Sequence, residues 1–234
     1  MAPSFIVSGV TASVIHISDS KALKCAFREH VSEVEFEQTV LEHLGLHRGI
    51  VRHFSNLHEG QITLEYYPYD VRRYVATSKP IPLELWALQL VETIIFIHAK
   101  GVIHRDLSPR NMLTSGGNGG IVLCDFAASS VNGKRQADIK PECRFYHWHT
   151  DRTEIQDDLF AMGSVLFELS TRQPPYAELQ LEEIRRLYRA GIFPLVDSLF
   201  MGKVITKCWM GNYESAEQFR SDLVCICVLF HIAY

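Results

Sequence analysis

The chain has 234 residues, of which 47% are hydrophobic and 21% are charged, and its formal net charge is −4. This length suits one large domain or two small lobes, and the composition excludes a disordered chain. No block of lysine or arginine stands out, so neither nucleic acid nor a membrane surface is expected as the main partner. The six cysteines show no metal-type spacing, which favours reduced thiols in the cytoplasm or the nucleus.

The first third of the chain is predicted to contain short strands and one helix. Ser32 and Glu35 have the spacing of a capping box, which predicts a helix that ends near Leu44, before Gly45. Around this helix, alternating apolar residues predict strands at Phe5–Val10, Ala12–Ile17, Lys21–Phe27, Ile50–Phe54 and Ile62–Tyr66.

Helices are expected to dominate from residue 82 onward, after which only Ile121–Cys124 is predicted as a strand. The stretch Asp158–Ser170 is apolar nearly all round, so we expect a buried central helix there. The apolar tail Leu223–Tyr234 has only twelve residues, well short of a membrane span. Further helices are predicted at Pro82–Ala99, Leu181–Ala190, Gly202–Trp209 and Ser215–Ile232. The order of elements predicts an α+β fold, with a small β-rich lobe followed by a larger helical lobe.

One run of polar residues carries the strongest chemical signal. Residues 104–111 read His-Arg-Asp-Leu-Ser-Pro-Arg-Asn, and Cys124-Asp125-Phe126 follows them. The run places a carboxylate, Asp106, before an amide, Asn111, and Asp125 adds a second carboxylate. Phosphoryl transfer needs a group that orients the attacking hydroxyl, and oxygen ligands that hold Mg²⁺ against nucleotide phosphates. These three side chains supply both.

The run resembles the catalytic loop H-R-D-L-x-x-x-N of the protein kinases, followed by most of their D-F-G motif. The resemblance covers nearly the whole chain and implies a bilobal protein-kinase-like fold, with ATP and Mg²⁺ as cofactors and a protein as the substrate. Asp106 would accept or orient the substrate hydroxyl proton, and Asn111 and Asp125 would ligate Mg²⁺. Arg105 would be the cation that a phosphorylated segment engages. Candidate acceptors in that segment are Ser129, Ser130, Thr150 and Thr153.

A lysine and a glutamate extend the resemblance to the first third of the chain. Lys24 ends the run Ala22-Leu23-Lys24, which resembles the V-A-I-K strand whose lysine holds the nucleotide phosphates. A lysine inside a hydrophobic strand needs an anionic partner. Glu37 falls in the middle of an apolar helix stripe, where a carboxylate is costly unless it meets a cation. Glu37 therefore resembles the helix glutamate that pairs with this lysine; two separate solvated charges are the alternative.

The loop that would cover the phosphates has only part of the glycine pattern of the family. Aligning Val14 with the valine of G-x-G-x-x-G-x-V puts Val7, Gly9 and Ala12 at the three glycine positions. Gly9 alone is a glycine, and the two side chains limit how closely the backbone can approach a phosphate.

The resemblance also implies a hinge and the limits of two lobes in a single domain of residues 1–234. The N-lobe would comprise residues 1–63, the hinge residues 64–70 and the C-lobe residues 71–234. Backbone groups of Glu65 and Tyr67 would bind the adenine edge, with Val14 and Ala22 also in the nucleotide site. Asp70 is a candidate ribose contact, although a solvated loop aspartate is favoured.

Two departures from the family pattern affect residues that shape the backbone. Ala127 replaces the D-F-G glycine and would cost about 1 kcal/mol if a left-handed backbone were required there. The A-P-E motif is absent from Cys143–Arg152, and its usual arginine partner is absent after Cys208-Trp209. Because both halves of this ion pair are missing together, we expect an alternative packing of the segment.

The class of acceptor hydroxyl stays open. Ser108 stands where serine/threonine kinases usually have a lysine, Arg110 matches tyrosine kinases, and Pro109 matches the serine/threonine pattern, which is slightly favoured. An active, monomeric protein kinase is the leading interpretation, because every polar group of the mechanism is present. A pseudokinase that acts as a binding or scaffold module is the second. A small-molecule phosphotransferase is third, because such proteins tend to have glycine where this chain has Arg105.

Overall fold

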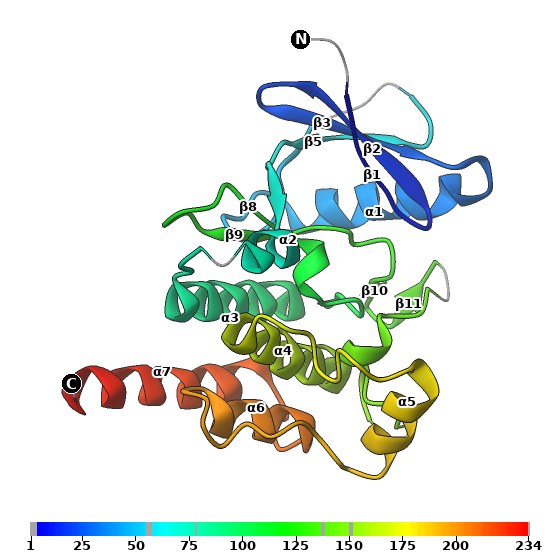
Figure 1. Ribbon diagram of the computed structural model, residues 1–234. Helices are drawn as coiled ribbons and strands as arrows, with labels where there is room; N and C mark the ends of the chain where they lie inside the picture. Colours follow the sequence, from blue (N-terminus) through cyan, green and yellow to red (C-terminus); the bar gives the residue numbers. More distant parts are fainter. Residues whose placement is uncertain (1–3, 55–57, 78, 137–138, 150–151, 234) are drawn as a thin grey trace.

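The computed structural model describes residues 4–54, 58–77, 79–136, 139–149 and 152–233, with side chains from residue 8 to residue 228 within these ranges. An antiparallel sheet with one long helix comes first in the chain, and a bundle of helices follows (Figure 1). The α+β fold predicted from the order of elements is confirmed.

The large sheet has five strands in the order β1-β2-β3-β5-β4. Its central strand, β3, pairs Lys24 with Val14 of β2 on one side and with Ile62 of β5 on the other. The helix α1 (Val31–Leu44) packs against β3 and β5. Lys24 thus lies on the central strand of the sheet, and the helix that carries Glu37 packs against this strand. The strands are β1 (Ser4–Ser8), β2 (Ala12–Ser18), β3 (Lys21–Ala26), β4 (His53–Phe54) and β5 (Gln61–Glu65).

The start of α1 differs from the sequence prediction. The 3-10 turn Arg28–His30 leads directly into the helix, so Ser32 lies inside its first turn and does not cap it. The Ser32 hydroxyl donates to Glu33 instead, at 2.9 Å. The predicted end is confirmed, because Gly45 has a φ of 71° and donates its N–H to Leu41 O.

Short strands connect the large sheet to the helices. One small sheet has the order β6-β8-β9 and the other β11-β10-β7. The first continues into α2 and α3, and the second holds the segment that follows Asp125. The elements are β6 (Tyr69–Asp70), α2 (Val71–Ala76), α3 (Leu83–Ala99), β7 (Val102–Ile103), β8 (Met112–Thr114), β9 (Ile121–Leu123), β10 (Ser130–Val131) and β11 (Lys134–Arg135).

The central helix is α4 (Glu154–Thr171), which is buried along most of its length, as the sequence predicts. It begins at Glu154 rather than Asp158, because Thr153 and Gln156 form a capping box that the prediction overlooked. It packs against α3 and α6, and α7 packs along α3. The remaining helices are α5 (Leu181–Arg189), α6 (Gly202–Trp209) and α7 (Ala216–Ala233).

The crossing of α4 and α6 depends on a glycine. A Cβ at Gly163 would lie 2.6 Å from Cys208 Cβ and 3.3 Å from Ile205 O. We therefore predict that Gly163→Ala lowers the free energy of unfolding by about 1–3 kcal/mol, because the helices must move apart. Urea denaturation measures this change.

Gly9→Ala is the matched control, because the added methyl group would meet Ala12 O at an ordinary 3.4 Å. Its free energy of unfolding should stay within about 0.5 kcal/mol of the wild-type value. Equal stability of the two variants would contradict the close packing of α4 on α6.

Candidate active site

The loop of residues 104–111 is held by a carboxylate of the central helix. Asp158 accepts hydrogen bonds from the backbone N–H groups of His104 (2.9 Å) and Arg105 (2.8 Å), and its Oδ2 lies 2.9 Å from His98 Nε2. Arg105 has a φ of 66°, an uncommon left-handed conformation for a non-glycine residue. The two N–H bonds to one buried carboxylate hold this strained turn in place.

His104 joins this loop to the segment that contains Asp125. Its Nδ1 accepts the N–H of Asp106, so Nε2 carries the proton and donates to Cys124 O at 3.1 Å. The ring also packs against Phe126, with centroids 4.8 Å apart. Burial lowers the pKa of His104, so the neutral form is maintained. His104 is thus a structural residue that connects the loop of Asp106 to the segment of Asp125.

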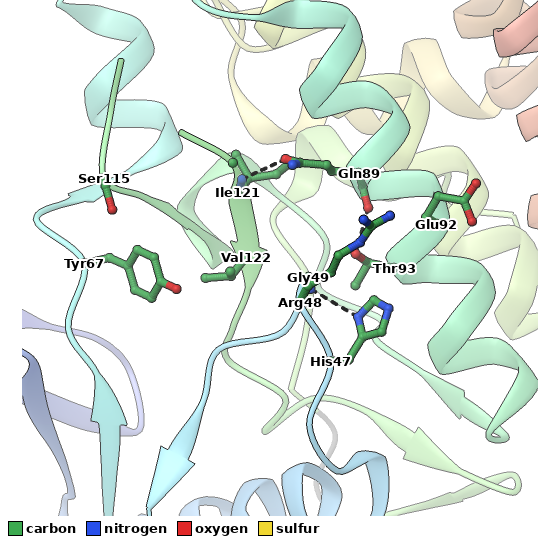
Figure 2. A pocket seen from close by; sticks show the side chains of 11 residues that line it. His47, Arg48, Gly49, Tyr67, Gln89, Glu92, Thr93, Ser115, Ile121 and Val122 are labelled. Carbon is green, nitrogen blue, oxygen red and sulfur yellow. Dashed lines mark hydrogen bonds between the residues drawn. The ribbon is translucent and has the colours of Figure 1, made fainter. Parts of the chain in front are cut away.

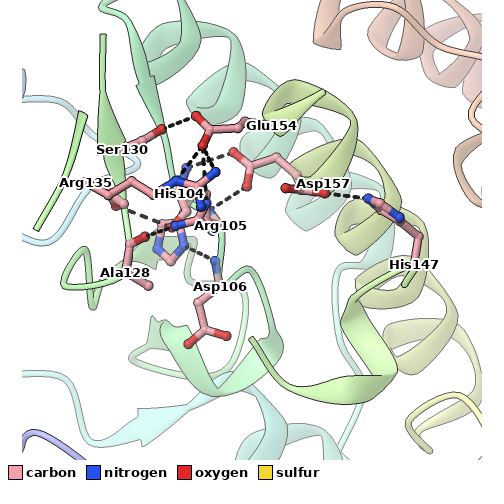
Figure 3. A network of polar contacts seen from close by, with 11 residues as sticks. His104, Arg105, Asp106, Ala128, Ser130, Arg135, His147, Glu154 and Asp157 are labelled. Atoms are coloured by element: carbon pink, nitrogen blue, oxygen red, sulfur yellow. Dashed lines mark hydrogen bonds and ion pairs between the residues drawn. The ribbon is translucent and has the colours of Figure 1, made fainter. Parts of the chain in front are cut away.

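Asp106 and Asn111 are joined directly, and Figure 3 shows Asp106 beside His104 and Arg105. Asn111 Nδ2 donates to both the carbonyl oxygen and Oδ2 of Asp106, each at 2.8 Å. The other carboxylate oxygen accepts the N–H of Glu142 at 3.3 Å. Burial and the nearby charge of Asp125 raise the pKa of Asp106 to about 7. Both Asn111 bonds use its amide nitrogen, so the amide oxygen remains the atom suited to a metal ion.

Three charged side chains from distant parts of the chain meet beneath the sheet. Lys24 Nζ lies 2.5 Å from Glu37 Oε2 and 2.8 Å from Asp125 Oδ1. Glu37 is fully buried and also accepts the N–H of Phe126 at 3.3 Å. The structure therefore brings together the lysine and the glutamate that the sequence analysis paired, and adds Asp125 to them.

The protonation of this group follows from its mutual contacts. Burial opposes the charge of Lys24, but Asp125 and Glu37 outweigh it and raise the pKa of the lysine. Burial also opposes ionisation of Asp125, yet Lys24 holds the pKa of that carboxyl below its usual range. The Asp125 side chain is 41% exposed to solvent, whereas the Glu37 side chain is fully buried. Asp125 is thus the carboxylate of the two that a cation could reach.

The phosphate-loop region is a tight turn between β1 and β2. Gly9 donates its N–H to Ala12 O at 2.9 Å, and Ala12 itself is buried. Val14 pairs with Lys24, and Ala22 pairs with Leu64 of β5 in the same sheet. These four residues therefore lie along one path from the turn to the hinge.

In residues 64–70, which the sequence analysis predicts to be a hinge, Glu65 donates its N–H to Arg52 O, and the hydroxyl of Tyr67 donates to Glu65 Oε2 at 3.2 Å. Asp70 does not lie free in a loop, contrary to the favoured expectation. It caps α2 by accepting the N–H of Arg73 at 2.8 Å, which ties up its carboxylate.

A cavity of about 290 Å³ lies beside Tyr67, between α3, the β8–β9 hairpin and the loop after α1 (Figure 2). The ring of Tyr67 lines it, together with Gln89 and Val122. Gln89 Oε1 accepts the N–H of Ile121 there. Tyr67 is also a predicted adenine-binding residue, whereas neither Lys24 nor residues 104–111 line this cavity.

The two departures from the family pattern are resolved by packing. Ala127 is buried and does not have a positive φ, so the backbone cost expected for it does not arise in this conformation. The left-handed residue is Asp125, with a φ of 62°. In place of an A-P-E ion pair, Arg152 donates to Trp209 O at 2.8 Å, and His147 pairs with Asp157 at the start of α4.

Sequence reasoning overlooked an arginine clamp beside Asp106. Arg72 of α2 binds both carboxylate oxygens of Glu168, through Nε at 2.7 Å and Nη2 at 2.8 Å. Its Nη1 donates to Glu142 at 2.8 Å, and Glu142 in turn contacts Asp106. The three residues are far apart in sequence and match no spacing rule, so no sequence signal could have identified them.

The match to known families follows this geometry. A model of the protein kinase domain matches residues 7–225, which is most of the chain. The chain belongs to the protein kinase family.

Several curated kinases are related to this protein kinase domain at low identity. It is 28% identical over 239 residues to "Probable serine/threonine-protein kinase gdt4" of Dictyostelium discoideum, covering 90% of this chain and 14% of the relative. It is 28% identical over 220 residues to "CBL-interacting protein kinase 20" of Oryza sativa subsp. japonica, covering 82% and 46%. It is 27% identical over 157 residues to "Kinase suppressor of Ras 2" of Homo sapiens, covering 57% and 16%. The chain thus spans less than half the length of each of these relatives.

The buried charges beneath the sheet yield a prediction about stability. Lys24→Met leaves Glu37 buried without its cation, so the free energy of unfolding should fall by about 3 kcal/mol. The double variant Lys24→Met/Glu37→Leu should regain about 1–3 kcal/mol of that loss, because no buried charge is left at Glu37. Chemical denaturation of the single and double variants measures the coupling.

Arg186→Met serves as the control, because it breaks an exposed ion pair with Glu183 and should leave stability nearly unchanged. Strictly additive effects of the Lys24 and Glu37 substitutions would show that the two charges are not coupled.

Proposed function

We propose that this chain is an ATP- and Mg²⁺-dependent protein kinase that phosphorylates a protein hydroxyl, with serine or threonine slightly favoured over tyrosine. The observation that supports this most directly is the meeting of Lys24, Glu37 and Asp125 beside the bonded pair Asp106–Asn111. Mg²⁺-ATP supplies the transferable γ-phosphoryl group and the charge neutralisation that its transfer requires.

The residues of this chain have separable roles in the proposal. Lys24, held by Glu37, binds the α and β phosphates, and Asp106 orients the acceptor hydroxyl and takes its proton. The Asn111 amide oxygen and the Asp125 carboxylate hold Mg²⁺. Among the described residues no cluster of three or more histidine, cysteine or acidic side chains could hold a metal by itself. A site with few protein ligands suits Mg²⁺, which binds through one or two carboxylates together with nucleotide phosphates.

The nucleotide base is placed by the hinge in this proposal. Backbone groups of Glu65 and Tyr67 bind the adenine edge, and Gly9, Val14 and Ala22 border the nucleotide from the sheet. The domain is then one unit of residues 1–234, with an N-lobe (1–63), a hinge (64–70) and a C-lobe (71–234). A preference for serine or threonine is supported by the name of one of the relatives above, a probable serine/threonine-protein kinase.

The setting of the protein is part of the proposal. All six cysteines are free thiols, which suits a reducing compartment, the cytoplasm or the nucleus. No helix in the described part of the chain is long and apolar enough to cross a membrane. We expect a monomer whose partners are ATP and a protein substrate.

A pseudokinase is the second candidate, and the β1–β2 turn is the observation that favours it. The Ala12 methyl group is buried and Thr11 O accepts the N–H of Phe27, so the turn is fixed to the sheet. A turn held in this way adapts less readily to phosphates than a glycine-rich loop.

Loss of Asp106 should separate binding from transfer. In Asp106→Ala, phosphate transfer from labelled ATP to a panel of proteins and peptides should fall by about 10²–10⁴-fold, because the hydroxyl loses its proton acceptor. The control is Asp197→Ala, which removes an exposed aspartate of the loop between α5 and α6 and should leave the rate unchanged. Transfer that survives in Asp106→Ala would refute the assigned role.

Metal binding by Asp125 is testable without turnover. ATP with Mg²⁺ should raise the melting temperature of the wild type more than ATP with EDTA, because ligands stabilise the state that binds them. In Asp125→Asn the difference between Mg²⁺ and EDTA should largely vanish, since a carboxylate ligand is lost. A full Mg²⁺ effect in this variant would exclude Asp125 as a ligand, and a melting shift without transfer by the wild type would favour the pseudokinase.

A further inference from the structure

The first turn of α4 carries a carboxylate that joins three separate elements (Figure 3). Glu154 Oε2 accepts a hydrogen bond from Ser130 Oγ of β10 at 2.6 Å. Its Oε1 accepts from Arg135 of β11, through Nε at 2.7 Å and through Nη2. The same oxygen lies 3.7 Å from Nε of Arg105 in the catalytic loop. One carboxylate thus connects the catalytic loop with the strands that follow Asp125.

Arg105 depends on this contact for charge compensation. Its side chain is only 9% exposed, and Nη1 donates to the neutral carbonyl oxygen of Ala128 at 3.2 Å. Asp158 is bonded to the backbone N–H of Arg105 and not to its guanidinium. Within the described ranges, Glu154 is the carboxylate that forms an ion pair with this guanidinium. A buried cation without such a partner is strongly destabilising.

The residues considered as phosphate acceptors are poorly placed to supply that charge. Ser129 and Ser130 are buried, and the Ser130 hydroxyl already faces the Glu154 carboxylate. A phosphate on Ser130 would meet a like charge. Thr153 caps α4 with its hydroxyl, and Thr150 lies outside the described residues.

Glu154 is also ionised at neutral pH. Burial alone would raise its pKa, but the hydrogen bonds from Ser130 and Arg135 and the charges of the two arginines lower it below the usual value. The carboxylate therefore carries its negative charge where the geometry places it.

We infer that Glu154 is a positioning residue that takes the place of a phosphorylated side chain, so that the catalytic loop and the β10–β11 segment are assembled without phosphorylation. The inference rests on the proposed function, because it describes how the same active site is kept in order. Glu154 acts through Arg105 and the segment, and it does not contact the substrate.

The test uses the protein treated with phosphatase, with its freedom from phosphate verified by intact mass. Three variants are compared with the wild type: Glu154→Gln, which removes the charge; Glu154→Asp, which keeps it on a shorter side chain; and Glu182→Gln. The last is the matched control, because Glu182 is a first-turn carboxylate of α5 whose ion pair, among the residues that the structure describes, is with Arg185 on its own helix. Amide hydrogen exchange of residues 128–136 and the initial rate of phosphate transfer are measured.

We expect the wild type without phosphate to transfer phosphate at its full initial rate, with less than about a twofold change after preincubation with ATP. Glu154→Gln should exchange the amides of residues 128–136 about tenfold faster, because that segment opens more readily. Its kcat should fall about tenfold while the KM for ATP stays nearly constant, since Lys24 and Asp125 are untouched. Glu154→Asp should recover part of both effects, and Glu182→Gln should resemble the wild type.

The outcomes separate this inference from the proposed function. Exchange in Glu154→Gln equal to that in Glu182→Gln overturns the inference, whether or not the wild type transfers phosphate. A wild type that becomes active only after it gains phosphate overturns it as well. If the wild type transfers no phosphate but Glu154→Gln opens the segment, the proposed catalysis fails while the positioning role of Glu154 stands.

Discussion

The buried contact between Lys24, Glu37 and Asp125 is the constraint on which the arrangement of the whole molecule depends. Lys24 and Glu37 are too costly to bury alone, so the strand and the helix that carry them must meet for either charge to be buried. The contact orients α1 against β3 and draws the backbone of Phe126 onto Glu37. The large sheet and the helical part are therefore joined through the same atoms that form the candidate nucleotide site.

The helix α4 is the second element that holds other parts of the molecule in place, through three carboxylates spaced along its length. Asp158 holds the backbone of the catalytic loop, Glu168 holds Arg72, and Glu154 holds Arg105 and Arg135. Each carboxylate projects from a helix that is buried along most of its length. The position of Asp106 is thus determined by rigid secondary structure, as its proposed catalytic role requires.

The replacements that depart from the kinase pattern all concern backbone shape and packing. Gly9 is the one glycine at the three glycine positions of the loop pattern, and Ala127 does not have a left-handed backbone. Arg152 donates to Trp209 O in the region where the sequence lacks both halves of the family's ion pair. The polar groups needed for phosphoryl transfer remain together in space. The replaced residues shape the backbone, whereas the retained residues carry the polar groups. Local packing can compensate for a lost glycine but not for a lost charge, which explains why a chain of low identity to its relatives keeps the arrangement of the family.

The sequence by itself determined the family, the order of the longer helices and of the large-sheet strands, and the motif of residues 104–111, because these depend on local motifs and on hydrophobic periodicity. It did not predict α2 or the short strands β6, β7, β8, β10 and β11. It also paired Lys24 with Glu37, since the cost of burying either charge alone can be inferred from the apolar residues around it. It misplaced the start of α1 at Ser32 and did not assign the cap of α2 to Asp70, because the preceding turn decides which residue is the cap. Only the tertiary structure could place Arg72 against Glu142 and Glu168, or Glu154 against Arg105, because these residues meet through the packing of helices remote in sequence. No spacing along a chain encodes such a contact; it exists only once the core has brought the elements together.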